Sequence, residues 1–242
     1  MQIIQSTKPA FRYLWKFGTM IPAYLAATRV AVFDLAEPEF FERCLGSIAI
    51  ISNPDKAGGI SLREMNARWM GSVNERLNAA LLAEGLVSAD KAVDFDPQLA
   101  LAADSVSYHH DMPWSSCVFG AWCVDGPERV LHFPLMNIFI PFKPGTMVLF
   151  DPAQPHALLR PGQTHYSAAD ASDPKGAERI SFVSFMASKA GPLAELLGAV
   201  AYDAAQHAHL PHTAAQYKVC KTHGTIIFES QETTQGALIE NN

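Results

Sequence analysis

The second half of the chain alternates short apolar runs with turn-forming residues. From about residue 105 the runs are rich in β-branched and aromatic side chains. Turn signals such as Asp125-Gly126-Pro127 and Lys143-Pro144-Gly145 separate them. Short strands at this spacing favour an antiparallel sandwich or barrel over alternating βαβ units. The predicted strands are Val106–His109, Cys117–Val124, Arg129–Phe133, Met136–Phe142, Thr146–Phe150, His156–Leu159 and Arg179–Met186.

The first half is mixed, with one strong helical pattern. Ser61 and Glu64 stand in the relation of a capping box, and an apolar residue follows at every fourth position. A shorter helix is expected after Pro38, and a strand over Arg29–Phe33. A C-terminal helix over 193–204 and a strand over Thr225–Phe228 complete the prediction. The apolar stripe of the long helix comprises Met65, Trp69, Val73, Leu77 and Leu81.

Composition indicates one globular domain. Of the 242 residues, 49% are hydrophobic and 17% are charged, and the net charge is −6, which argues against a disordered chain. No cluster of cations appears, so we expect no nucleic-acid partner. No linker divides the chain. We therefore expect a single domain over 1–242, with mixed N-terminal support (1–104), a β core (105–187), and a C-terminal helix and tail (188–242).

Features of the N-terminal region and the cysteines predict a cytoplasmic protein. The first residues lack the order of basic and then apolar residues that marks a signal peptide. The apolar stretch 20–35 contains Pro22, Arg29 and Asp34, so we expect no membrane span. The four cysteines form no CxxC pair, which favours reduced, buried thiols. The oligomeric state is open.

The candidate chemistry begins at Tyr108-His109-His110-Asp111. Residues two apart on a strand share a face, so His109 and Asp111 project together. With a third ligand from a neighbouring strand they would form the two-His, one-carboxylate arrangement of non-haem Fe(II) sites. A short loop that contains Pro152 and Pro155 leads to His156, the candidate third ligand. By itself H-x-D is a weak signal, and a surface His and Asp are the plain alternative.

The last apolar strand carries a cation at its head. Arg179 and Ser181 share one face, and an unpaired buried charge is costly, so Arg179 requires an anion. A dicarboxylate cosubstrate would supply one through a bidentate guanidinium–carboxylate pair and the Ser181 hydroxyl. Arg160 lies four residues after His156 on the same side of its strand, and it is a rival anion partner.

These parts, in this order, resemble the Fe(II)/2-oxoglutarate-dependent dioxygenase superfamily. The motifs are His109-x-Asp111, the segment Pro144–Asp151 followed by His156, and Arg179-x-Ser181. The Arg-x-Ser strand is similar to that of isopenicillin N synthase-like and plant-type members. The segment before His156 is similar to that of prolyl-hydroxylase-like members. The resemblance covers about residues 105–187.

The resemblance implies a fold of the α+β class, mainly β: a double-stranded β-helix, jelly-roll or cupin-like, with flanking helices. It implies that His109, Asp111 and His156 hold Fe(II), and that Arg179 and Ser181 hold the distal carboxylate of 2-oxoglutarate. With O2 as the other cosubstrate, such an enzyme oxidises an unactivated C–H bond of a small organic substrate, most often by hydroxylation. Succinate and CO2 are released. The presence of Asp111 argues against halogenation.

Several further residues and readings accompany this hypothesis. Ser107, Phe119 and Asn137 are candidate contacts to the substrate or to the C1 carboxylate. The segment 161–178 is an apparent insertion and a candidate lid. A cupin-like metalloenzyme that does not use 2-oxoglutarate, a peptide or protein hydroxylase, and a non-catalytic β-sandwich binding module are the alternatives.

Overall fold

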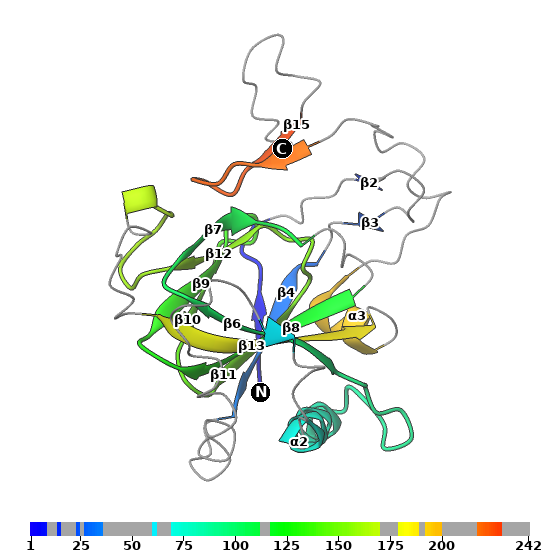
Figure 1. Ribbon diagram of the computed structural model, residues 1–242. Helices are drawn as coiled ribbons and strands as arrows, with labels where there is room; N and C mark the ends of the chain where they lie inside the picture. The colour runs from blue at the N-terminus through cyan, green and yellow to red at the C-terminus, as the bar shows by residue number, and fades with distance from the viewer. Residues whose placement is uncertain are drawn as a thin grey trace.

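A computed structural model gives the protein as two facing antiparallel sheets with helices on one side (Figure 1). The structure describes residues 1–8, 14–15, 23–24, 27–35, 60–61, 69–111, 117–169, 179–188, 192–199 and 217–228. The larger sheet has seven strands and the smaller has four. Within the described ranges, no helix is long and apolar enough to cross a membrane.

Eight consecutive strands, β6 to β13, build the core of the fold. Four of them form the centre of the larger sheet in the order β11-β8-β13-β6, and the other four form the smaller sheet in the order β10-β9-β12-β7. The bounds are β6 Asp96–Ala103, β7 Val106–His109, β8 Cys117–Asp125, β9 Arg129–Phe133, β10 Ile138–Phe142, β11 Thr146–Phe150, β12 His156–Leu159 and β13 Ile180–Ser188.

The path of the chain through these strands identifies the fold. Each successive strand crosses to the opposite sheet, except for the hairpin of β9 and β10, whose strands pair with each other. Eight strands wound in this way between two sheets make a double-stranded β-helix, the jelly-roll architecture of cupins. This strand order confirms the fold class predicted from the sequence.

Most of the remaining elements extend or cover the larger sheet, and two strand pairs stand apart from it. β1 and β4 continue it beyond β11, and β5 continues it beyond β6. Two short hairpins, β2–β3 and β14–β15, complete the described strands. The bounds are β1 Gln2–Gln5, β2 Leu14–Trp15, β3 Ala23–Tyr24, β4 Arg29–Asp34, β5 Ile60–Ser61, α2 Trp69–Ala83, α3 Pro192–Leu197, β14 Tyr217–Val219 and β15 Ile226–Phe228.

Two apolar clusters lie on opposite faces of the larger sheet. The inner cluster fills the space between the sheets and includes Leu131, Phe150 and Ile180. The outer cluster packs α2 and α3 against the sheet, where buried Trp122 and Leu77 belong to the same group. Both faces of the larger sheet are therefore buried, which explains the nearly continuous apolar runs in its strands.

The fold also corrects some of the predicted elements. β6, which begins at Asp96, was not among the predicted strands, and it pairs with β13 along its length. Ser61 pairs with Leu99 as part of β5, and the described part of the long helix begins at Trp69. The residues between them, which include Glu64 of the predicted capping box, lie outside the described residues. Asn137 has a φ of 53° in the turn before β10, so that strand begins at Ile138. The helix expected after Pro38 lies outside the described residues.

Candidate metal centre

His109, Asp111 and His156 come together at one end of the smaller sheet. β7 and β12 pair antiparallel with His109 opposite His156, and Asp111 lies two residues after the end of β7. One ligand atom from each residue lies within 4.8 Å of the others, and His156 Nε2 is 3.6 Å from Asp111 Oδ2. The structure therefore assembles the three predicted ligands into a single cluster.

Main-chain carbonyls orient both imidazole rings. Nδ1 of His109 lies 2.8 Å from the carbonyl oxygen of Ser107, and Nδ1 of His156 lies 2.9 Å from that of Gln154. A carbonyl oxygen only accepts, so each Nδ1 carries the proton and donates it. Nε2 is then the nitrogen of each ring that can bind a metal, and the hydrogen bond fixes the ring plane.

Aromatic rings surround the distal histidine. The ring centroid of His156 is 4.9 Å from that of Phe150 and 6.0 Å from that of Phe133. Phe119 contacts Phe150 edge-on, with centroids 6.2 Å apart. His156 is only 6% exposed, whereas the Asp111 side chain is 29% exposed. The cluster thus has a dry aromatic side and a side that opens toward solvent at Asp111.

Burial raises the pKa of the carboxyl group in the cluster and lowers the pKa of its most buried imidazole. It raises the pKa of Asp111, an effect that the nearby His109 partly offsets. It lowers the pKa of His156 well below the usual value, and His109 lowers it further. The neighbouring His110 is affected in the same way, and its pKa falls to about 4. The imidazoles of His156 and His110 are therefore neutral at neutral pH, the state in which an imidazole binds a metal.

This donor set fits a divalent first-row metal. Two neutral imidazole nitrogens and one carboxylate can occupy one face of an octahedron, and the remaining positions stay open to other ligands. Within the described residues, this is the group of three or more His, Cys, Asp or Glu side chains that could hold a metal ion. The donor chemistry, the fixed tautomers and the close approach of the three ligand atoms all agree with the predicted Fe(II) site.

The predicted anchor for 2-oxoglutarate is not brought to this cluster. Ile180 and Phe182 of β13 pack between the sheets, whereas Val183 belongs to the cluster on the helix side. By strand alternation Ser181 shares the face of Val183, so its hydroxyl points away from the metal side. Arg179 precedes β13 and is exposed. The Arg-x-Ser pair therefore shares a face, as predicted, but that face is the outer one.

The rival cation, Arg160, lies on the metal-facing side. It follows β12 and, being two and four residues after Leu158 and His156, shares the face of these inward-directed side chains. Arg129 at the start of β9 shares the face of inward-directed Leu131, two residues later, and is only 3% exposed. Both arginines lie at the end of their strands opposite to the metal cluster.

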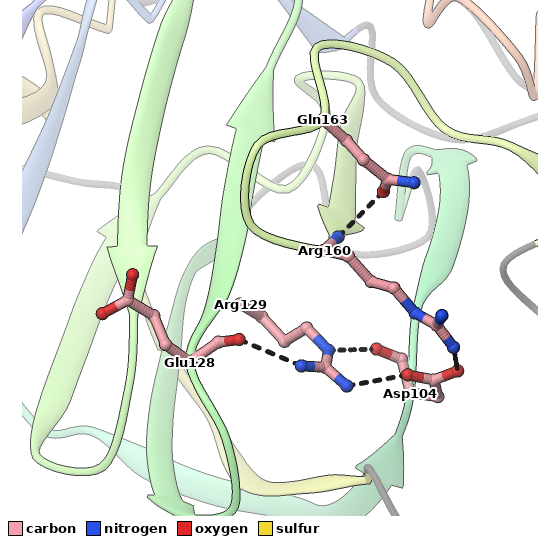
Figure 2. A network of polar contacts seen from close by, with 5 residues as sticks. All are labelled: Asp104, Glu128, Arg129, Arg160 and Gln163. Atoms are coloured by element: carbon pink, nitrogen blue, oxygen red, sulfur yellow. Dashed lines mark hydrogen bonds and ion pairs between the residues drawn. The ribbon is translucent and has the colours of Figure 1, made fainter.

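A single carboxylate joins the two arginines (Figure 2). Arg129 donates from Nη2 to Asp104 Oδ1 at 2.8 Å and from Nε to the Asp104 carbonyl oxygen at 2.7 Å, and Arg160 donates from Nη2 to Asp104 Oδ2 at 2.7 Å. Burial tends to raise the pKa of Asp104, but the two arginines outweigh it and hold that pKa below its ordinary value. Figure 2 shows the carboxylate of Glu128 directed away from Arg129. The network was not predicted, although Arg160 within it was.

The other candidate contacts have different surroundings. The carbonyl oxygen of Ser107 orients His109. Phe119 is half-buried and packs against the inner cluster near Phe150. Asn137 lies in the turn between β9 and β10, and its left-handed backbone conformation belongs to that turn. Its side-chain amide donates to Thr7 Oγ1 at 3.2 Å.

The described part of the inserted segment covers the opposite side of the smaller sheet. Tyr166 packs against Tyr108, Ala157 and Leu159, which alternate with the inward-facing residues of β7 and β12. Tyr166 thus lies against the outer face of the smaller sheet, and residues 170–178 lie outside the described ranges.

No family model and no curated protein matches this chain. A comparison with solved structures does give matches. The non-haem α-ketoglutarate-dependent epimerase SnoN from nogalamycin biosynthesis is 9% identical, with a TM-score of 0.42 over 66% of this chain and 78% of that chain. A collagen prolyl hydroxylase from Paramecium bursaria chlorella virus 1, in complex with 2-oxoglutarate, is 10% identical, with a TM-score of 0.43 over 66% and 95%. HygX from Streptomyces hygroscopicus, with nickel and 2-oxoglutarate bound, is 8% identical, with a TM-score of 0.42 over 66% and 82%.

At these TM-scores the likeness is partial, so the fold is assigned from the strand order and the site from its own geometry. The resemblance predicted from the sequence is confirmed in both respects. The chain has the double-stranded β-helix, and it has the His-x-Asp…His cluster at the end of its smaller sheet.

Proposed function

We propose that this protein is an Fe(II)- and 2-oxoglutarate-dependent oxygenase that oxidises a C–H bond of a small organic substrate. The observation that carries the proposal is the position of the three ligands. His109, Asp111 and His156 meet at the end of a double-stranded β-helix, with both Nε2 atoms available to a metal. When bound, Fe(II) with 2-oxoglutarate and O2 supplies the oxidising chemistry, and succinate and CO2 are the co-products.

The side chains around the cluster have distinct roles in this proposal. His109 and His156 provide neutral nitrogen ligands, and Asp111 provides the negative charge that offsets part of the metal charge. Phe150 and Phe133 pack beside His156 and keep water from that side of the metal. The more exposed side, at Asp111, is where a small substrate would approach.

For the cosubstrate, we propose Arg160 rather than Arg179 as the partner of the distal carboxylate. Arg160 lies on the same face of the smaller sheet as His156 of β12. A dicarboxylate held by the metal would extend along this inner face, where it would meet the arginine. Four residues of strand span roughly 13 Å, so the arginine side chain has to reach back toward the metal. In the structure that guanidinium is paired with Asp104, which also binds Arg129, so it would exchange this partner for the carboxylate.

A second candidate is a metalloenzyme of the same fold that does not use 2-oxoglutarate. The observation in its favour is the exposure of Arg179 together with the outer-face position of Ser181. The two candidates differ in whether 2-oxoglutarate is consumed.

The test is consumption of 2-oxoglutarate by protein that has been loaded with Fe(II) without oxygen and then exposed to O2. We expect succinate to form with the wild-type protein and to be lost in His156→Ala. We expect Arg160→Gln to raise the KM for 2-oxoglutarate at least about tenfold, and Arg179→Gln to leave it nearly unchanged. Metal binding without any succinate would favour the second candidate. A raised KM in Arg179→Gln alone would overturn the choice of Arg160.

A further inference from the structure

The loop between β11 and β12 is buried along its whole length. Asp151 is 0% exposed and Gln154 is 2% exposed, although loops normally run over the surface. A buried loop must satisfy its own polar groups. Here the Asp151 carboxylate accepts the N–H of Ala153 at 3.0 Å, and the Asp151 carbonyl accepts the N–H of Gln154 at 2.9 Å. The loop is therefore a fixed turn with a defined shape.

Two carbonyl groups of this loop hold two of the metal ligands. Pro152 accepts the main-chain N–H of Asp111 at 2.8 Å. Gln154 accepts the Nδ1–H of His156 at 2.9 Å. The placement of the loop therefore sets both the position of the carboxylate and the plane of the distal imidazole.

The side chain of Gln154 ties the same loop to a third part of the chain. Its Nε2 donates to the carbonyl oxygen of Ala27 at 3.2 Å. The segment around Ala27 is itself fixed, because the N–H of Thr28 donates to the carbonyl of Leu197 at the end of α3. The glutamine amide thus links the ligand-holding loop to the entrance of β4 and to α3.

The other half of this amide has no such partner. Oε1 of Gln154 is buried and has no hydrogen-bond partner in the part of the chain that the structure describes. A buried amide oxygen left in this state opposes folding, so the glutamine is a poor choice for stability alone. Its use at this position is better explained by the donor to Ala27, which fixes the loop.

We propose that Gln154 is a positioning residue of the metal centre. Its side-chain amide holds the loop against Ala27, so that its own carbonyl keeps the His156 ring turned with Nε2 toward the metal. The inference rests on the proposed metal site. Partners of this kind, which contact a ligand rather than the metal, typically change metal affinity by 10- to 100-fold when they are lost.

The test compares Gln154→Met with the wild-type protein in the metal-free full chain. Methionine has a similar length and shape but no donor, and the substitution also removes the buried Oε1. We expect the dissociation constant for Ni(II), measured by calorimetry, to rise at least about tenfold. We also expect the visible spectrum of bound Co(II) to change, while the thermal midpoint of the metal-free protein changes little.

Asn78→Leu provides a matched control. Asn78 on α2 also fixes a loop through its amide, with Nδ2 2.7 Å from the Val93 carbonyl oxygen and Oδ1 2.7 Å from the Val93 nitrogen. It belongs to the helix side of the molecule. We expect this variant to lower the thermal midpoint and to leave Ni(II) affinity and the Co(II) spectrum unchanged.

The outcomes separate the inference from the proposed function. If the wild-type protein binds neither metal, the metal site and the inference fall together. If it binds both and Gln154→Met binds Ni(II) equally well with the same Co(II) spectrum, the inference alone is overturned. Should Gln154→Met fail to fold, Gln154→Asn takes its place. Its shorter amide is expected to weaken Ni(II) binding, and wild-type affinity would overturn the inference.

Discussion

At the scale of single residues, strand alternation predicts which side chains share a face of the sheet. It does not predict whether that face points between the two sheets or outward. His109 and Asp111 project together, and the pairing of β7 with β12 adds His156. Arg179 and Ser181 also share a side, but packing of Ile180 and Phe182 between the sheets turns that side outward. Sequence spacing holds no information on this choice, because the neighbouring strands decide it.

The charge of Asp111 leads to a prediction about metal affinity. It is the one carboxylate among the three ligands, so it alone offsets metal charge in the cluster. We expect Asp111→Asn to weaken Co(II) binding at least about tenfold, measured by titration of the metal-free protein. Asp125→Asn, at the exposed end of β8, serves as the control and should bind normally. Equal affinity for Asp111→Asn and the wild-type protein would exclude this carboxylate as a ligand.

At the scale of elements, the strands with β-branched and aromatic residues were predicted at or near their observed bounds. β7, β9, β11 and β12 have the predicted bounds. β6 was missed because its sequence, Asp-Pro-Gln-Leu-Ala-Leu-Ala-Ala, has no β-branched residue and places a proline near its start. Its strand conformation comes from pairing with β13, a long-range contact that local propensity does not encode.

The turn between β8 and β9 leads to a prediction about stability. Gly126 has a φ of +108°, and a Cβ there would lie 2.6 Å from the Arg179 carbonyl oxygen and 2.7 Å from the Ile180 Cα. We expect Gly126→Ala to reduce the free energy of unfolding by about 3 kcal/mol or more, because neither backbone atom can move easily. Denaturant titration measures the change.

Gly162 is the matched control for this turn. Its φ is +82°, but a Cβ would meet nothing within 4 Å. Gly162→Ala should therefore cost only the intrinsic penalty of a left-handed residue, about 1–2 kcal/mol. Similar losses in the two variants would contradict the close approach of the β8–β9 turn to β13.

At the scale of the whole molecule, buried neutral histidines couple stability to pH. Burial lowers the pKa of His132 to about 4, with a smaller contribution from His165, and His110 has a similar value. His132 receives the hydroxyl hydrogen bond of buried Tyr108, whose pKa burial raises to about 12. The unfolded chain takes up these protons near pH 6.5, but the folded chain does not.

A folded-state pKa below the unfolded value means that stability is lost as the pH falls from 6.5 toward 4. We expect the metal-free protein to be less stable at pH 5 than at pH 7.5, by about 2 kcal/mol for each such histidine. The raised pKa of Asp111 acts in the opposite direction. His132→Asn should reduce this pH dependence, because it removes one of the buried rings. Equal unfolding free energies of the wild-type protein at both pH values would contradict the burial of these rings.

Metal binding should also stabilise the whole chain. The three ligands come from two strands and the segment that follows β7, so the unfolded chain holds no preformed site. With Ni(II) at 100 times its dissociation constant, linkage predicts a gain of about 2.7 kcal/mol. Thermal unfolding with and without the metal measures the gain, and His156→Ala should abolish it. A gain that persists in His156→Ala would place the binding elsewhere.

The central claim is that one site holds both Fe(II) and 2-oxoglutarate. The most direct test is an anaerobic titration of the metal-free protein with Fe(II) and then with 2-oxoglutarate, recording the visible metal-to-ligand charge-transfer band of the chelate. The account predicts a band that is absent in His156→Ala and that needs far more 2-oxoglutarate in Arg160→Gln than in Arg179→Gln. Iron binding without the band, or no iron binding at all, would contradict it.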